Sequence, residues 1–279
     1  MERSTIAKEI QVAPIFRWAG SKRKLVNRLL ANVPEDFKCY VEPFAGSACL
    51  FFALKPQFAV LGDFNESLIE AYQVVARSPK RVHDAAARMP NTKNYYYHLR
   101  STAPLTLSPL QRAARFLYLN RYCFNGVYRT NRSGKFNVPR GRDTGTLPDL
   151  QAMRRCSKAL KGAELVAGDF RTTLAKVQAG DFVYLDPPYA KIDDRYSGEY
   201  GYGAFSSKDL EALHHELNAI DQKGASFLLS YRYSKRLRFD LDKWHTSVIS
   251  VRRHVAGFSS HRGVVREFLV SNRAIKKAQ

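Results

Sequence analysis

Cysteine is scarce in this sequence, and the four cysteines form no metal-binding pattern. Cys39, Cys49, Cys123 and Cys156 lie far apart in the 279-residue chain, with no CxxC pair and no histidine at a zinc-ligand spacing. Scattered cysteines of this kind are typical of buried free thiols. The sequence therefore predicts no disulfide bond and no metal site.

Long apolar runs are missing as well. No uncharged apolar stretch approaches the ~18 residues that a membrane helix needs, and the start of the chain lacks the apolar segment of a signal peptide. Hydrophobic residues still make up 45% of the chain, enough for the core of one large domain or of one domain with an insertion. We expect a soluble, cytoplasmic monomer with no membrane partner.

Acidic residues are absent from residues 85–142, although the whole chain contains 25 of them. The basic residues of this stretch are Arg88, Lys93, Arg100, Arg112, Arg115, Arg121, Arg129, Arg132, Lys135, Arg140 and Arg142. The chain carries a formal net charge of +20, and such an excess repels itself unless a polyanion neutralises it. A solvated basic face is one explanation. A phosphate-binding surface is the one we favour.

Short apolar segments alternate with helical ones over most of the chain. Runs typical of buried strands occur at residues 39–41, 58–61, 164–167, 182–185, 226–230, 248–251 and 264–270. Helical patterns occur between them at residues 24–30, 67–76 and 208–220. This alternation predicts an α/β fold built on an open, mostly parallel sheet.

Residues 76–160 interrupt the alternation. They are rich in Arg and Tyr, with a helical pattern at residues 110–119 and a turn-like NRSG sequence starting at Asn131. The segment contains most of the acid-free stretch. We therefore predict one domain formed by residues 1–75 and 161–279, and an inserted, mainly helical domain at residues 76–160 that binds nucleic acid.

The nine residues from Asp181 to Tyr189, DFVYLDPPY, join an apolar strand to an acid, two prolines and an aromatic. Open α/β sheets bind ligands at the carboxyl ends of their strands, where this sequence places Asp186. Because the prolines fix the backbone and lack N–H donors, nearby carbonyls can face a ligand. We predict an acceptor shelf for an amino group beside the Tyr189 ring. The alternative is a rigid loop in which Asp186 caps a helix.

Two further segments have the pattern of a nucleoside site. In VEPFAGSACL, a predicted strand turns through Gly46 into a helix, which lets a ligand approach the backbone closely. In LGDFNE, Asp63 ends the next strand, where nucleoside-binding sheets place the acid that binds ribose hydroxyls. The alternative for Asp63 is to cap the following helix.

Aromatic and basic residues are interleaved in two other segments. FRWAGSKRK, at residues 16–24, joins Trp18 to a basic cluster, and by itself it would indicate a basic N-terminal arm. NRYCFNGVYRTNRSGKFNVP, at residues 120–139, places Arg and Asn among aromatics. Arg suits guanine edges and phosphates, and Asn suits adenine edges. The alternative is an aromatic core with solvated arginines.

Together these segments resemble the Dam-type adenine-N6 DNA methyltransferases. WAGSK, EPFAG, LGDFN, NRYCFNG with GKFNVP, DPPY and the closing REFLV occur in the order of that family, over residues 16–272. The resemblance implies a Rossmann-like sheet that binds S-adenosylmethionine (AdoMet) and an inserted target-recognition domain that binds double-stranded DNA. Ala48 departs from the pattern, because relatives often have a second glycine there.

The resemblance also implies roles for single residues. Catalysis would rest on Asp186, Pro187 and Tyr189. The cofactor would contact Trp18, Lys22, Phe44, Gly46, Asp63, Asp169, Phe170 and Asp186. DNA would contact Phe124, Asn125, Arg129, Asn131 and Pro139, with Arg129 reading guanine.

We therefore expect base flipping and direct transfer of a methyl group to adenine in a GATC-like duplex site, with residues 190–204 as a mobile loop over the DNA. Two alternatives keep the same fold. An enzyme acting on RNA adenine or on a protein amide nitrogen would use a similar shelf, and an inactive protein would bind DNA only as a regulator. An active enzyme would work alone or beside a cognate restriction endonuclease.

Overall fold

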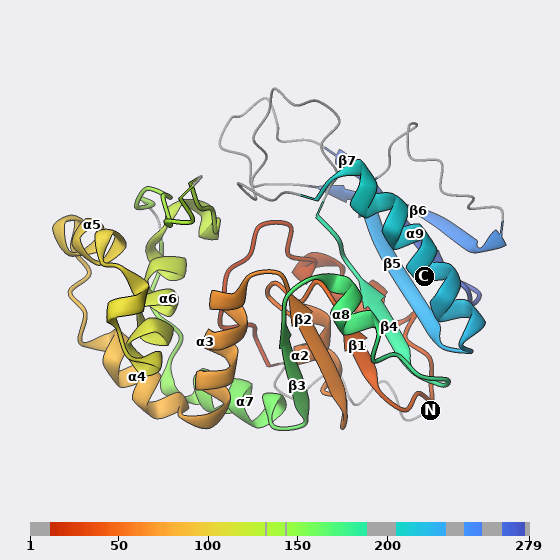
Figure 1. The fold of residues 1–279 in the computed structure, drawn as a ribbon, viewed down its shortest axis with the longest axis horizontal. Helices are drawn as coiled ribbons and strands as arrows, with labels where there is room; N and C mark the ends of the chain where they lie inside the picture. The colour runs from red at the N-terminus through yellow and green to blue at the C-terminus, as the bar shows by residue number, and fades with distance from the viewer. Residues whose placement is uncertain are drawn as a thin grey trace.

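The computed structural model of the protein describes residues 12–131, 133–142, 144–188, 205–232, 243–252 and 264–276. Tyr189 and the predicted loop at residues 190–204 lie outside these ranges. Within them, seven strands form one sheet (Figure 1). The strands are β1 (Tyr40–Glu42), β2 (Ala59–Asp63), β3 (Ala163–Ala167), β4 (Phe182–Leu185), β5 (Ser226–Arg232), β6 (His245–Arg252) and β7 (Val264–Ser271).

The strand order is β3-β2-β1-β4-β5-β7-β6. Neighbours from β3 to β5 pair in parallel, whereas β7 runs antiparallel to both β5 and β6. Each of the seven predicted runs corresponds to one strand, so the mostly parallel α/β sheet is confirmed. The order along the sheet reverses between β1 and β4, and parallel sheets bind ligands at the carboxyl ends of their strands beside such a reversal.

Helices connect and cover the strands. They are α1 (Val26–Leu30), α2 (Cys49–Leu54), α3 (Glu66–Arg77), α4 (Pro79–Ala87), α5 (Lys93–Ser101), α6 (Pro109–Tyr122), α7 (Leu150–Leu160), α8 (Phe170–Leu174) and α9 (Ser207–Gln222), with 3₁₀ turns η2 (Arg23–Leu25), η3 (Pro104–Thr106) and η4 (Phe124–Gly126). The helices predicted from periodicity correspond to α1, α3, α6 and α9. Side chains cap several of them: Asn65 accepts from Leu68 N at the start of α3, and Ser206 begins α9 with a capping box.

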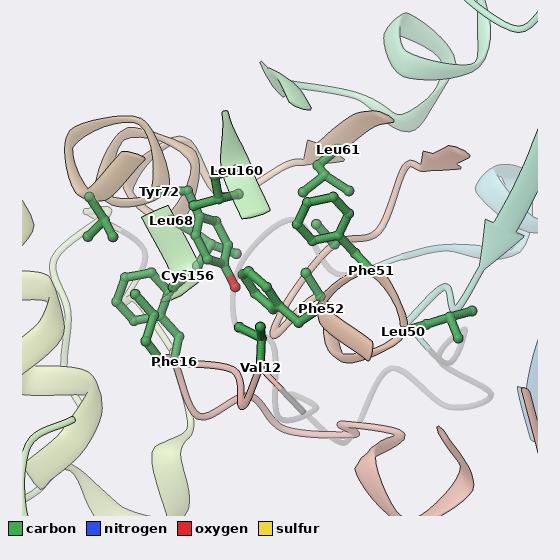
Figure 2. Close-up of a cluster of buried hydrophobic side chains, with 14 of the residues drawn as sticks. Val12, Phe16, Leu50, Phe51, Phe52, Leu61, Leu68, Tyr72, Cys156 and Leu160 are labelled. Carbon is green, nitrogen blue, oxygen red and sulfur yellow. The ribbon is translucent and has the colours of Figure 1, made fainter. Parts of the chain in front are cut away.

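The two faces of the sheet bury different clusters, because alternate residues of a strand point to opposite sides. On one face, Phe182 and Tyr184 of β4 pack in a cluster with residues from α2, α3, α6 and α7. On the other face, Val183 and Leu185 pack with residues from α8, α9 and β5. Figure 2 shows part of the first cluster, in which the Phe16 and Tyr72 rings meet edge to face with centroids 4.9 Å apart.

Helices α4, α5 and α6 lie together beside the β3 edge of the sheet, away from β6 (Figure 1). A third buried cluster joins α5 and α6 to the segment that follows them; its members are Tyr96, Leu99, Tyr118, Leu119, Tyr122, Cys123, Phe136 and Val138. All four cysteines are free thiols, as predicted, and three of them are buried. Within the described ranges, no helix combines the length and the apolar character that crossing a membrane requires.

Candidate active site

A cavity of about 510 Å³ opens at the carboxyl ends of β1 and β4, where the strand order reverses. Every predicted cofactor residue lines it, together with Pro187 of the predicted catalytic segment. These residues are Trp18, Lys22, Phe44, Gly46, Asp63, Asp169, Phe170 and Asp186. Segments that are far apart in the sequence therefore meet in one place, because the ends of parallel strands share one edge of the sheet.

The turn after β1 requires its glycine. Gly46 has a φ of +47°, and a Cβ atom added there would lie 2.6 Å from Trp18 Cδ1. Its N–H donates to Asp63 Oδ2 over 2.9 Å, and its carbonyl accepts from the Tyr72 hydroxyl over 3.0 Å. Ala48 also has a positive φ, +49°, which explains why a second glycine suits this position. Both backbone polar groups of Gly46 are therefore hydrogen-bonded, which fixes the conformation of the turn.

Asp63 ends β2 and does not cap the next helix, so the capping alternative is wrong. The cap of α3 is Asn65, whose own N–H donates to Asp63 Oδ1 over 2.8 Å. Burial raises the pKa of the Asp63 carboxyl to about 6, against hydrogen bonds from Asn65 and Gly46 that lower it. Each carboxylate oxygen has more than one lone pair, so Asp63 can still accept from a ligand.

Asp186 forms a short ion pair with Lys22. Lys22 Nζ donates to Asp186 Oδ1 over 2.6 Å. Glu267 of β7 approaches the same ammonium from behind, with Oε2 3.7 Å from Lys22 Nζ. The Lys22 and Glu267 side chains are 5% and 2% exposed, whereas Asp186 is open to the cavity at 20%.

More polar groups lie under the cavity floor. Glu42 ends β1 and accepts from the Tyr40 hydroxyl over 2.9 Å, and burial raises the pKa of Glu42 well above its usual range. Tyr184 of β4 is buried, and its hydroxyl has no hydrogen-bond partner among the described residues. Sequence analysis missed Glu42, Tyr184 and Glu267. Tyr184 and Glu267 belong to the runs predicted at residues 182–185 and 264–270, and Glu42 directly follows the run at residues 39–41. The pairing register of β1 with β4 places Glu42 and Tyr184 on the same face of the sheet.

Aromatic rings form the rest of the wall. Phe44 stacks on Phe170 with centroids 5.3 Å apart, and Phe64, which sequence analysis also missed, lines the cavity with 70% of its surface exposed. Asp169 caps α8, and Arg171 donates to both of its carboxylate oxygens over 2.7 and 2.8 Å. These bonds lower the pKa of Asp169.

The predicted DNA-binding residues lie in a hairpin that follows α6. The hairpin runs from Cys123 to Arg140, and antiparallel bridges join Cys123 to Arg140 and Thr130 to Phe136. Phe124 is exposed and its N–H donates to the Pro139 carbonyl over 2.9 Å. Asn125 has a φ of +54°, a conformation that Asn tolerates. Arg129 Nε donates to Asn137 Oδ1 over 3.0 Å, which orients the guanidinium.

The turn of this hairpin is closed by Asn131. Its side-chain oxygen accepts from the N–H groups of Ser133 and Lys135, both over 3.0 Å. Thr130 and Gly134, beside it, line the cavity. The hairpin therefore reaches the predicted cofactor residues.

Two contacts join the segment before α1 to α6 and to the hairpin that follows α6. The Trp18 ring stacks on Tyr128 with centroids 6.0 Å apart and planes 16° apart. Asn120, buried in α6, accepts from Arg17 N over 2.8 Å and donates to Arg17 O over 2.7 Å. One side chain thus satisfies both backbone groups of the residue that precedes Trp18.

The sheet order, the single antiparallel strand β7 and the cavity beside β1 and β4 define a Rossmann-like methyltransferase fold. Over residues 18–256 the chain matches the D12 class N6 adenine-specific DNA methyltransferases, and it belongs to that family.

Similar proteins cover almost the whole chain. It is 33% identical over 274 residues to the type II methyltransferase M1.LlaDCHI of Lactococcus lactis subsp. cremoris, covering 95% of this chain and 96% of that relative. It is 30% identical over 248 residues to the type II methyltransferase M.MjaIII of Methanocaldococcus jannaschii, covering 81% and 86%. It is 28% identical over 260 residues to the DNA adenine methylase of Escherichia coli strain K12, covering 91% and 93%.

The chain is therefore an adenine-specific DNA methyltransferase, and DNA is its substrate. Membership of this family supports DNA adenine, and not RNA or a protein amide, as the target.

Proposed function

We propose that the protein transfers a methyl group from AdoMet to N6 of an adenine that has been flipped out of duplex DNA. The observation that carries the proposal is the convergence of Asp63, Gly46, Lys22 and Asp186 on one cavity. When bound, AdoMet supplies an electrophilic methyl group on a positively charged sulfur. The residues of the chain would bind the cofactor and the DNA, orient them and stabilise the charge that develops.

The cavity residues fit such a cofactor. The Asp63 carboxylate suits the ribose hydroxyls, and the turn at Gly46 lets a ligand approach the backbone. Phe64 and the stacked pair of Phe44 and Phe170 offer apolar rings to a purine. The Tyr184 hydroxyl, which has no partner in the described part of the chain, adds a polar group at the floor of the cavity. The negative Asp186 carboxylate would attract a cation such as the sulfonium.

The adenine amino nitrogen is a poor nucleophile, because its lone pair is delocalised into the purine. The Asp186 carboxylate and the Pro187 carbonyl would accept hydrogen bonds from the amino group and stabilise the positive charge that develops on it. Because the target lies inside the duplex, the base must be flipped out, at a cost of a few kcal/mol. Tyr189 would stack on the extruded ring.

Residues 76–160 are proposed to form the domain that reads the DNA. Within them, exposed Phe124 suits insertion beside an unstacked base. Asn125 is next to Phe124 in the chain, and Pro139 lies opposite Phe124 in the hairpin, where its carbonyl accepts from Phe124 N. The Arg129 guanidinium, oriented by Asn137, suits the O6 and N7 atoms of guanine. Since Asn131 Oδ1 is engaged in its own turn, its contact with DNA would be made by the amide nitrogen.

We propose a GATC-like target, a monomeric enzyme, and a role either alone or as the partner of a restriction endonuclease. The relatives named type II methyltransferases support the second role.

The test is incubation of duplex DNA of varied sequence with labelled AdoMet, followed by mapping of the methylated bases. Asp186→Ala should abolish labelling of adenine, whereas Glu211→Ala, which removes an exposed acid of α9, should retain it. Label on cytosine, or full activity of Asp186→Ala, contradicts the proposal. Absence of label at GATC alone removes only the proposed target sequence.

A further inference from the structure

Glu267 lies behind Lys22 and does not line the cavity. It comes from β7, and its Oε2 is 3.7 Å from Lys22 Nζ. Ser230 Oγ, on β5, donates to the same Oε2 over 3.4 Å. Lys22 also donates to Asp186 Oδ1 over 2.6 Å. One buried ammonium therefore contacts two carboxylates, and only that of Asp186 lines the cavity.

The three groups are two acids and one base. When ionised, Lys22 contributes +1 and the two carboxylates contribute −1 each, so loss of Glu267 makes the charge beside the cavity more positive by one unit. Burial favours the neutral forms of three titratable groups close to the cluster: it raises the pKa of Cys49 to about 12 and those of Glu42 and Tyr184 well above their usual ranges.

We propose that Glu267 is a positioning residue that acts through Lys22: it balances the ammonium, so that Asp186 keeps its negative charge toward the cavity. Without Glu267, the pair of Lys22 and Asp186 would be neutral overall. With it, the site favours a ligand that carries a positive charge at its reacting centre. The same negative charge would stabilise the positive charge that develops on the adenine amino nitrogen during transfer.

This inference rests on the proposed use of AdoMet, and it predicts a preference that can be measured without catalysis. The sulfonium of AdoMet is positive, whereas the thioether of S-adenosylhomocysteine, its demethylated form, is neutral. The two ligands otherwise share their adenine, ribose, carboxylate and ammonium groups. The ratio of their dissociation constants therefore isolates the effect of the sulfur charge, because contacts common to both ligands cancel.

The experiment measures both dissociation constants by isothermal titration calorimetry, with the full-length chain and no DNA. Glu267→Gln removes one negative charge at nearly constant shape, and the preference for AdoMet over S-adenosylhomocysteine should fall roughly three- to tenfold. Lys22→Gln should raise the preference. The double variant has the same net charge as the wild type, and its preference should return toward the wild-type value.

Glu164→Gln is the matched control. Glu164 is also a strand glutamate paired with a lysine, with Oε1 2.9 Å from Lys176 Nζ, but it is exposed on β3. Its substitution should leave the preference unchanged.

An unchanged preference in Glu267→Gln overturns the inference even if both affinities fall, because a structural defect weakens both ligands alike. Should circular dichroism show that this variant does not fold, an unchanged preference in Lys22→Gln overturns it instead. If the wild type binds neither ligand, the proposed cofactor is wrong, which is a different outcome.

Discussion

At the scale of single residues, Gly46 offers a sharp test of the cofactor turn. Gly46→Ala would place a Cβ atom 2.6 Å from the Trp18 ring at a φ of +47°. We expect a loss of about 1–3 kcal/mol in the free energy of unfolding and a weaker affinity for AdoMet, because Trp18 must move. Thermal unfolding and calorimetric titration measure the two effects.

Gly224→Ala separates the clash from the backbone strain. Gly224 has a φ of +76°, and its nearest contact for an added Cβ is an ordinary one, 3.9 Å from Ala179. It should cost about 1 kcal/mol of stability and leave AdoMet affinity unchanged. Equal losses of affinity in the two variants would show that the Trp18 contact is irrelevant.

Asp63 predicts a pH dependence. Because burial raises its pKa to about 6 from 3.8, the folded protein holds a proton that the unfolded chain has released. This group therefore favours folding below pH 4, and its contribution is lost as the pH rises through about 6. Cofactor binding should follow the opposite trend, since the ionised carboxylate is the better acceptor for ribose hydroxyls.

The measurement is AdoMet affinity between pH 5 and 8. The affinity should decrease as the pH falls through about 6, and Asp63→Asn should remove that decrease. Affinity independent of pH in the wild type would show that Asp63 makes no contact with the cofactor.

At the scale of elements, Asn120 joins α6 to the segment before α1. Asn120→Ala would leave the backbone N–H and C=O of Arg17 without the partner seen here. We expect a loss of about 1–3 kcal/mol in the free energy of unfolding. AdoMet affinity should fall as well, because Trp18 follows directly. Asn218→Ala is the control: Asn218 Nδ2 donates to the His214 carbonyl within α9, its Oδ1 accepts from Lys243 Nζ, and Asn218 does not line the cavity, so its loss should leave affinity unchanged.

The strands were predictable and several helices were not. Parallel strands covered on both faces are continuous apolar runs, such as FVYL in β4, and local sequence is enough to find them. Helices α4 and α5 are short, and α5 is rich in Tyr, so their periodicity is weak. The place of β7 between β5 and β6 depends on pairing between distant segments, which no local pattern encodes.

In the candidate site, too, some residues could be predicted from local sequence and others could not. Asp63 and Asp186 could be predicted because each follows a strand at the edge where parallel sheets bind ligands. The contact of Lys22 with Asp186 spans 164 residues, and Glu267 comes from a third segment. Their meeting follows from the strand order and not from spacing.

At the scale of the whole molecule, some basic residues are engaged within the protein and are not available to contact DNA phosphates. Arg115 is buried and donates to the carbonyls of Leu99 and Arg100, and Arg112 is paired with Glu70. Exposed residues such as Lys135 remain for phosphate contacts. Net charge thus overstates the number of phosphates that the protein can neutralise.

Lys135→Gln should weaken DNA binding equally for all sequences. The slope of log K against log salt should become shallower by about 0.9, because one fewer counterion is released. Fluorescence anisotropy at several salt concentrations measures the slope. Lys223→Gln, an exposed lysine at the end of α9, carries the same charge change away from the hairpin. If both variants alter the slope alike, binding is not centred on the hairpin.

The position of β1 in the middle of the sheet has a consequence for synthesis. Its residue Tyr40 pairs with Ala59 of β2 but also with Phe182 of β4, a separation of 182 − 40 = 142 residues. At roughly 5–20 residues per second, a ribosome needs about 7–28 s to make the intervening chain. During that time one edge of β1 is without its final neighbour, so the nascent chain is exposed to wrong strand pairing until β4 emerges.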